Sequence, residues 1–93
     1  MKKSRGADIA KKLGVSKTRG LEAVIKADLI DAVMKVVKKE GITHAELAAR
    51  SGLPRSAVTG ILSGSLQKVT LDRILKLVES AGLTAEVKVK RVA

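Results

Sequence analysis

The chain has 93 residues and a net charge of +10, and it contains no Cys, Phe, Tyr or Trp. This length suits one small domain, whose core must be built from Leu, Ile, Val, Ala and Met. The lack of cysteine excludes disulfides and thiolate metal sites. The lack of aromatic rings disfavours single-stranded nucleic-acid binding by base stacking, so duplex DNA remains open as a partner. The basic excess favours an anionic partner, usually nucleic acid, although a basic protein without such a partner is the alternative.

The N-terminus is basic, but no apolar stretch of signal-peptide type follows it and no segment approaches the length of a membrane span. We therefore expect a cytoplasmic protein without a membrane partner. Residues 1–20 carry seven Lys and Arg residues against Asp8 alone, a net charge of +6. We interpret this basic leader first as a disordered or partly helical arm around DNA. A partner-binding segment and a solubilising tail are the alternatives.

A long helix is predicted from Leu21 onward, ending at Gly41, a residue typical of the position just after a helix. Apolar residues recur there at spacings of three and four, as expected for one buried face: Leu21, Val24, Ile25, Leu29, Ala32, Val33, Val36 and Val37. The opposite, solvent-facing side is predicted to carry Glu22, Lys26, Asp31, Lys35 and Lys38. Met34 is assigned to the core.

Two short helices follow. Thr43 and Glu46 have the spacing of a capping box, which predicts a helix start, with Leu47 and Ala48 facing inward and Gly52 as the end. Pro54 suits the first turn of the next helix. That second helix carries Ala57, Val58, Ile61 and Leu62 and runs into a loop at Ser63, Gly64 and Ser65.

A fourth helix is predicted after Thr70, which can cap it, and before Gly82. Its inward face is predicted to hold Leu71, Ile74, Leu75 and Val78. Residues 84–92 then alternate between apolar and polar side chains, which is a strand pattern. A lone strand in a helical chain needs a partner, and the same strand of a second copy, antiparallel about a two-fold axis, is the simplest one. A frayed polar tail is the alternative.

The two short helices satisfy the requirements of a helix-turn-helix. Such a motif needs a small residue in its first helix, a glycine in the turn and apolar residues on the buried face of the second helix. Ala48 and Gly52 meet the first two needs, and the apolar positions are Leu53, Val58 and Ile61, extended by Leu47 and Leu62.

The stretch ITHAELAARSGLPRSAVTGILSG resembles the helix-turn-helix of the phage-repressor (XRE) family. The similarity continues through SLQKVTLDRILKLVESAGLTAEVKVKRVA and is greatest to HigA-like antitoxins and their stand-alone relatives, covering residues 21–92. The resemblance implies an all-α fold, a lambda-repressor-like bundle of four to five helices with a C-terminal β-strand used for dimerisation. We expect a leader at 1–20, a helix-turn-helix domain at 21–83 and the strand at 84–93.

The resemblance also implies a set of DNA contacts. The recognition helix near Pro54 would contact base edges through Arg55, Ser56 and Thr59. Phosphate contacts are carried over to Thr43, His44, Ser63 and Lys68. Arginine can bond guanine with two hydrogen bonds, whereas phosphate contacts hold register and read little sequence. Solvated surface residues are the alternative reading for Arg55, His44 and Lys68.

Two positions depart from the family pattern. Pro54 stands where a capping Ser or Thr is usual, so the helix start is expected to shift by a residue. Gly60 occupies a position that often carries a long reading side chain, which leaves fewer groups to specify bases. Base readout is therefore expected to depend mainly on Arg55.

No constellation for catalysis, no cofactor motif and no metal site is found in the sequence, so an enzyme is not expected. The predicted function is a dimeric, sequence-specific transcriptional regulator, a repressor that binds a pseudo-palindromic operator in double-stranded DNA. The resemblance adds an antitoxin role with a toxin protein as partner. A protein-interaction module and a non-specific basic DNA-binding protein are the alternatives.

Overall fold

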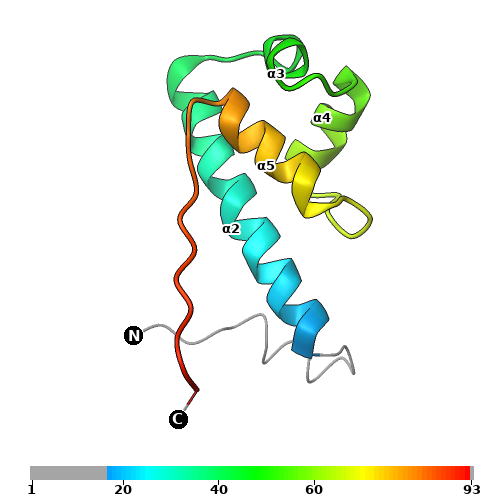
Figure 1. The fold of residues 1–93 in the computed structure, drawn as a ribbon. Coiled ribbons are helices and arrows are strands. Elements are labelled where there is room, and N and C mark those ends of the chain that lie inside the picture. The colour runs from blue at the N-terminus through cyan, green and yellow to red at the C-terminus, as the bar shows by residue number, and fades with distance from the viewer. Residues whose placement is uncertain (1–16, 93) are drawn as a thin grey trace.

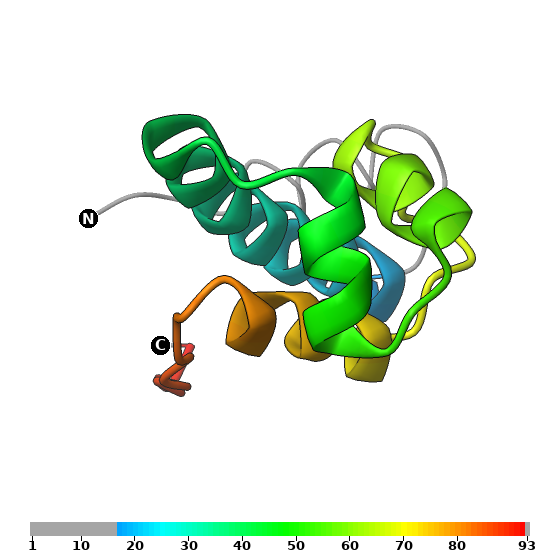
Figure 2. The same ribbon diagram turned by 90° about the horizontal axis from the view of Figure 1, so that it is seen from above.

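The computed structural model describes residues 17–92, and in this part of the chain it contains four α-helices. They are α2 (Lys17–Glu40), α3 (His44–Ser51), α4 (Arg55–Leu62) and α5 (Leu71–Ser80). The long helix α2 packs against α5, and the pair formed by α3 and α4 contacts both of them (Figure 1). Figure 2 shows the same arrangement from above, with α3 lying across α5. The helical bundle is the predicted fold class; the first sixteen residues of the predicted leader lie outside the described part.

The buried side of α2 differs from the predicted one. Helix α2 begins at Lys17, before the predicted start, and the side chains that it buries include those of Ile30 and Val33. Leu21 is 54% exposed, and so its assignment to the core was wrong. The same correction applies to three other exposed residues: Ile25, Ala32 and Met34. The 3.6-residue period identifies a helix, but the side that becomes buried depends on where the neighbouring helices lie.

Lys26 was predicted to face solvent, and this was also wrong: the residue is only 5% exposed. Its Nζ donates to the carbonyl oxygens of Val69 at 2.5 Å and Leu66 at 3.5 Å. The same Nζ lies 3.3 Å from the carboxylate of Glu22, one turn earlier on α2. A buried ammonium is tolerated because it is hydrogen-bonded and paired. Lys26 thereby ties the loop between α4 and α5 to the long helix.

The start of α3 and the turn that follows this helix both form as the sequence predicts. The capping box is present, because the Thr43 side chain accepts from the Glu46 N–H while the Glu46 side chain accepts from the Thr43 N–H. Helix α3 ends at Gly52, whose φ of 77° is in the left-handed region that favours glycine, and whose N–H donates to Ala48 O at 2.9 Å. Pro54 is the N-cap of α4, immediately before the first helical residue, and provides no side-chain cap.

The core joins all four helices and contains only aliphatic side chains. Its most deeply buried members are Leu47, Ile74, Leu77, Val33 and Val58. On α5, the Thr70 cap and the burial of Ile74 and Val78 confirm the prediction, but Leu71 and Leu75 are exposed and Leu77 was missed. Helix α5 carries two overlapping apolar stripes, and periodicity alone cannot say which of them faces the body.

The predicted C-terminal strand is not formed within residues 17–92 of the single chain. After Leu83 the backbone has no regular structure and runs as an extended segment away from the helices (Figure 1). Its side chains are exposed, with Val87 at 84%. A β-strand is defined by its hydrogen-bonded neighbour, so one copy of a lone extended segment cannot form one. Dimerisation through this segment stays a prediction.

None of the helices in the described range is both long enough and apolar enough to cross a membrane. Helix α2 has 24 residues, but charged side chains occur along its whole length.

Candidate nucleic-acid interface

The outward face of α4 carries the three side chains predicted to contact bases. Arg55, Ser56 and Thr59 are all exposed. The opposite face of the same helix buries Val58, Ile61 and Leu62 in the core. Helix α4 is therefore anchored on one side and open on the other, as a helix that enters a DNA groove must be.

Gly60 lies beside this open face. A side chain added at Gly60 would meet nothing within 4 Å, and its φ is not positive, so neither packing nor backbone conformation requires glycine there. The observation agrees with the expectation that the middle of α4 offers few groups for reading bases.

A hydrogen bond that sequence reasoning missed links the two helices of the motif. Nδ1 of His44, at the start of α3, lies 2.9 Å from Oγ1 of Thr59 on α4. A predicted phosphate contact and a predicted base contact are thus bonded to each other. The imidazole orients the Thr59 hydroxyl, and its tautomer decides which of the two groups donates. The residues are 15 positions apart, so no local pattern could have indicated the contact.

The side chain of Thr43 is occupied by the capping box. Its Oγ1 accepts from the Glu46 N–H at 3.0 Å and donates to Glu46 Oε1 at 3.1 Å. The Glu46 carboxylate also accepts from the Thr43 N–H at 3.0 Å. The start of α3 therefore already holds a negative charge, and a DNA phosphate would have to compete with it for the same N–H groups.

Glu46 is held in its charged form by these contacts. The hydrogen bonds from the Thr43 N–H and hydroxyl lower the pKa of Glu46, and Arg50 lowers it further. Arg50 Nη2 lies 3.6 Å from Glu46 Oε2. The pKa of Glu46 is lower in the folded state than in the unfolded state. This carboxylate therefore stabilises the fold at pH values above the unfolded-state pKa, which is about 4.3. Its contribution is lost as the pH falls through the lower folded-state pKa.

A pH-dependent stability difference follows for Glu46→Gln, which keeps an acceptor but removes the charge. We expect urea unfolding to show the variant less stable than the parent at neutral pH, with the difference shrinking as the pH falls below about 4. In a Thr43→Val background, which lacks the cap hydroxyl, the same substitution should have a smaller effect. A difference that stays constant from neutral to acidic pH would contradict this assignment.

Ser63 and Lys68, the two predicted phosphate contacts after α4, differ in their availability. The Ser63 hydroxyl donates to Gly60 O at 2.8 Å and its N–H donates to Thr59 O at 3.0 Å, so both donors are used within the chain. A phosphate only accepts hydrogen bonds, so Ser63 can bind one only after its hydroxyl rotates. Lys68 is exposed, and it lies in the turn whose carbonyl groups Lys26 holds.

Two exposed cations of the candidate interface have no carboxylate partner among the described residues. The cations that form ion pairs within residues 17–92 include Lys26, Lys35, Arg50, Lys76 and Lys88. Arg55 and Lys68 form no ion pair with a carboxylate of these residues. Exposed cations without a carboxylate partner are the kind of group that a polyanion attracts.

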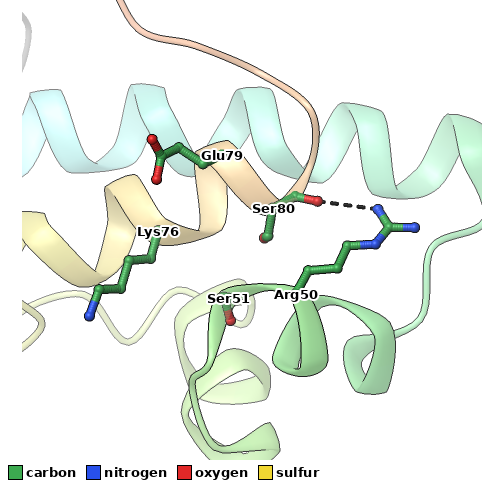
Figure 3. Close-up of a pocket in the computed structure, with 5 residues that line it drawn as sticks. All are labelled: Arg50, Ser51, Lys76, Glu79 and Ser80. Atoms are coloured by element: carbon green, nitrogen blue, oxygen red, sulfur yellow. Dashed lines mark hydrogen bonds between the residues drawn. The ribbon is translucent and has the colours of Figure 1, made fainter.

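A hollow lies between the end of α3 and α5, lined by Arg50, Ser51, Lys76, Glu79 and Ser80 (Figure 3). Here Arg50 points across the gap, and its Nη1 donates to the carbonyl oxygen of Ser80 at 3.2 Å. Lys76 pairs with Asp72 at 3.5 Å. Both cations are therefore engaged within the protein, and we interpret this hollow as the seam between α3 and α5. No cluster of three or more potential metal ligands occurs in the range that the structure describes.

A model of the family described as "Helix-turn-helix domain" matches residues 9–90, which is most of the chain. Comparison with curated proteins and with solved structures gives no match. Helix-turn-helix domains are DNA-binding modules that place their second helix in the major groove. The match agrees with the open second helix α4 and the glycine turn before it. The chain belongs to the helix-turn-helix domain family.

Proposed function

We propose that the protein is a sequence-specific transcriptional regulator that binds double-stranded DNA with α4 in the major groove. The observation that carries this proposal is the asymmetry of α4. Its apolar side is anchored in the core by Val58, Ile61 and Leu62. On its other side Arg55 is exposed and forms no ion pair with a carboxylate of the described residues.

Base reading would depend mainly on Arg55, at the first position of α4. An arginine there can donate two hydrogen bonds to the O6 and N7 atoms of guanine. Ser56 and Thr59 share the exposed face and supply shorter hydroxyl groups, with Thr59 oriented by His44. Gly60 adds nothing to the readout. A short recognition sequence with one dominant guanine contact in each half-site is the expected result.

Phosphate contacts would frame this readout on both sides. Lys68 is the strongest candidate because its turn is fixed by the buried Lys26 and its ammonium is exposed. His44 and Thr43, at the start of α3, are the candidates that precede α4 in the chain. Ser63 and Thr43 are the weakest of the predicted set, because the hydroxyl and the N–H of each are used internally.

The regulator is proposed to act in the cytoplasm as a homodimer on a pseudo-palindromic operator. Two recognition helices would then be spaced by one turn of DNA, about 34–36 Å. Occupying a promoter in this way would repress transcription. The resemblance to HigA-like antitoxins supports a narrower proposal, in which the protein also binds and neutralises a toxin. A short reading frame for a small ribonuclease beside this gene would favour that role.

The experiment is a salt titration of binding to a selected site and to random duplex DNA of equal length. The site is first obtained by repeated selection from a random-sequence library. A regulator should prefer its selected site by about 10³-fold or more. A non-specific basic binder should show equal affinities with a steep salt dependence, and a protein-interaction module should bind neither DNA at physiological salt.

Two substitutions distinguish base-specific contacts from electrostatic contacts with the phosphates. Arg55→Ala should cost about 1–3 kcal/mol on the selected site and relax the preference at one base position. Lys68→Ala should weaken selected and random DNA alike and reduce the salt slope by about 1. Lys35→Ala on the exposed side of α2 removes the same charge away from α4 and serves as the control. Unchanged binding by both Arg55→Ala and Lys68→Ala would remove the support for this interface.

A further inference from the structure

Residues 84–92 have the alternation of a β-strand but no neighbouring strand among residues 17–92. The backbone hydrogen bonds described for the helical body end at Leu83, whose N–H donates to Val78 O at 3.0 Å. Beyond it every described side chain is exposed. Glu86 Oε1 and Lys88 Nζ lie 4.0 Å apart, so these side chains, two positions apart, point to the same side of the chain. This is the period-2 alternation of a β-strand.

The two faces of the segment are chemically distinct. Ala85, Val87 and Val89 form an apolar face, and a charged face holds Glu86, Lys88 and Lys90. Exposed valine side chains are unfavourable in water. Pairing with another strand would place the apolar side chains of the two strands side by side and remove part of their surface from water. The partner strand that this chain itself can supply is the same segment of a second copy.

We propose that residues 84–90 pair antiparallel with the same residues of a second copy, in the register that places Val87 opposite Val87 on a two-fold axis. The proposal rests on the homodimeric regulator proposed above and names its interface. Directly opposite residues in an antiparallel pair lie on the same face, so a symmetric register must be centred on a residue. Only a few residues of the segment can therefore lie on the two-fold axis.

Charge complementarity selects among these centres. With Val87 at the centre, Glu86 of each copy lies opposite Lys88 of the other, which gives two cross-strand ion pairs. A centre at Glu86 places that carboxylate opposite itself. A centre at Lys88 gives two pairs between Glu86 and Lys90, but it also places the central lysine opposite itself. A centre at Val89 places Lys88 opposite Lys90 twice. Opposite charges across a strand pair stabilise it and like charges destabilise it, so the centre at Val87 is favoured.

The apolar face agrees with the same register. Val87 meets its own copy, and Ala85 of each copy meets Val89 of the other, so three apolar pairs lie side by side. The two intrachain pairs between Glu86 and Lys88, one in each copy, are exchanged for two pairs between copies.

Cysteine cross-linking tests the register directly, because the chain has no cysteine of its own. In the proposed register the two positions 87 are direct cross-strand neighbours, within the Cα separation that a disulfide bridges, about 4.4–6.8 Å. Val87→Cys should therefore form a covalent dimer under mild oxidation. Val89→Cys is the matched control, since its two copies would be about 13 Å apart along the ribbon. Stronger cross-linking at position 88 or 89, or a Val87→Cys protein that stays monomeric, would overturn the register.

Charge reversal provides a second test that leaves the chain free of cysteine. Glu86→Lys and Lys88→Glu should each weaken dimerisation about tenfold or more in sedimentation equilibrium, because each places like charges opposite each other twice. The double variant restores two opposite-charge pairs and should dimerise like the parent. In a register centred on Lys88, by contrast, the double variant would place the lysine introduced at position 86 opposite Lys90. Failure of the double variant to recover the dimer would therefore contradict the proposal.

These measurements are made without DNA, which separates the pairing from the regulator function. A Val87→Cys dimer that shows no preference for a selected DNA site would support the pairing and reject the regulator. Site-specific binding by a protein that never cross-links at position 87 would do the opposite.

Discussion

Replacing Lys26 by alanine is expected to lower the free energy of unfolding by about 2–4 kcal/mol. The carbonyl groups of Leu66 and Val69 would lose the ammonium that donates to them, and the buried four-carbon side chain would leave a cavity. Glu22 would also lose its partner, which contributes less because it is half exposed. Urea unfolding followed by circular dichroism measures the change.

The chain offers a matched control for Lys26 on the same helix. Lys35 forms an ion pair with Asp31 at the same spacing and the same distance, 3.3 Å, but its side chain is 78% exposed. Lys35→Ala should change the stability by no more than about 0.5 kcal/mol. Lys26→Met keeps most of the buried volume and removes only the hydrogen-bond donor. Its loss of stability should therefore lie between those of Lys26→Ala and Lys35→Ala. Equal stabilities of the Lys26→Ala and Lys35→Ala proteins would show that burial of Lys26 contributes nothing.

The loop that Lys26 holds carries Lys68, so the effect should extend to DNA binding. Under conditions where the Lys26→Met protein remains folded, its affinity for selected and random DNA should fall together, as expected when a phosphate contact loses its position. A loss confined to the selected site would instead indicate disturbed base reading.

Truncating Leu77 is expected to destabilise the protein by about 2–5 kcal/mol, the range measured for fully buried Leu→Ala changes. Leu77 is 0% exposed and lies in the core between α5 and the rest of the bundle. In so small a domain a change of this size is a large part of the total stability. The expected observation is a urea midpoint shifted strongly downward with little change in the slope of the transition.

Leu75 is the control for Leu77, because it is the same residue type two positions earlier on the same helix and is 38% exposed. Leu75→Ala should cost about 1 kcal/mol or less, since little apolar surface is lost from the interior. The comparison also decides between the two apolar stripes of α5. Should Leu75→Ala be the more damaging change, α5 would have to be rotated relative to the described fold.

The helix-turn-helix was the part of the fold that local sequence determined best. The capping box of Thr43 and Glu46, the left-handed Gly52 and the burial of Val58 and Ile61 were all predicted and are all present. Each of these features depends on residues within a few positions of one another. Short-range hydrogen bonds and backbone preferences are readable without knowledge of the neighbours.

The candidate interface was predictable only in part. The exposure of Arg55, Ser56 and Thr59 follows from the buried side of α4, which the sequence pattern indicates. The bond between His44 and Thr59 and the internal use of the Ser63 donors were not predictable. The first depends on how α4 crosses α3, and the second on which nearby acceptor a rotatable hydroxyl chooses.

The amino-acid sequence by itself determined that this chain forms one long and three shorter helices with aliphatic faces, two of them joined by a glycine turn, and that it has the charge expected of a DNA-binding protein. The tertiary structure alone decided which side of α2 and of α5 is buried, and that Lys26 enters the interior while Leu21 remains outside. Helical periodicity identifies every apolar stripe of a helix that could be buried. Which stripe is covered depends on the helices that pack beside it, and a buried ammonium becomes favourable only when distant carbonyl groups such as those of Leu66 and Val69 converge on it.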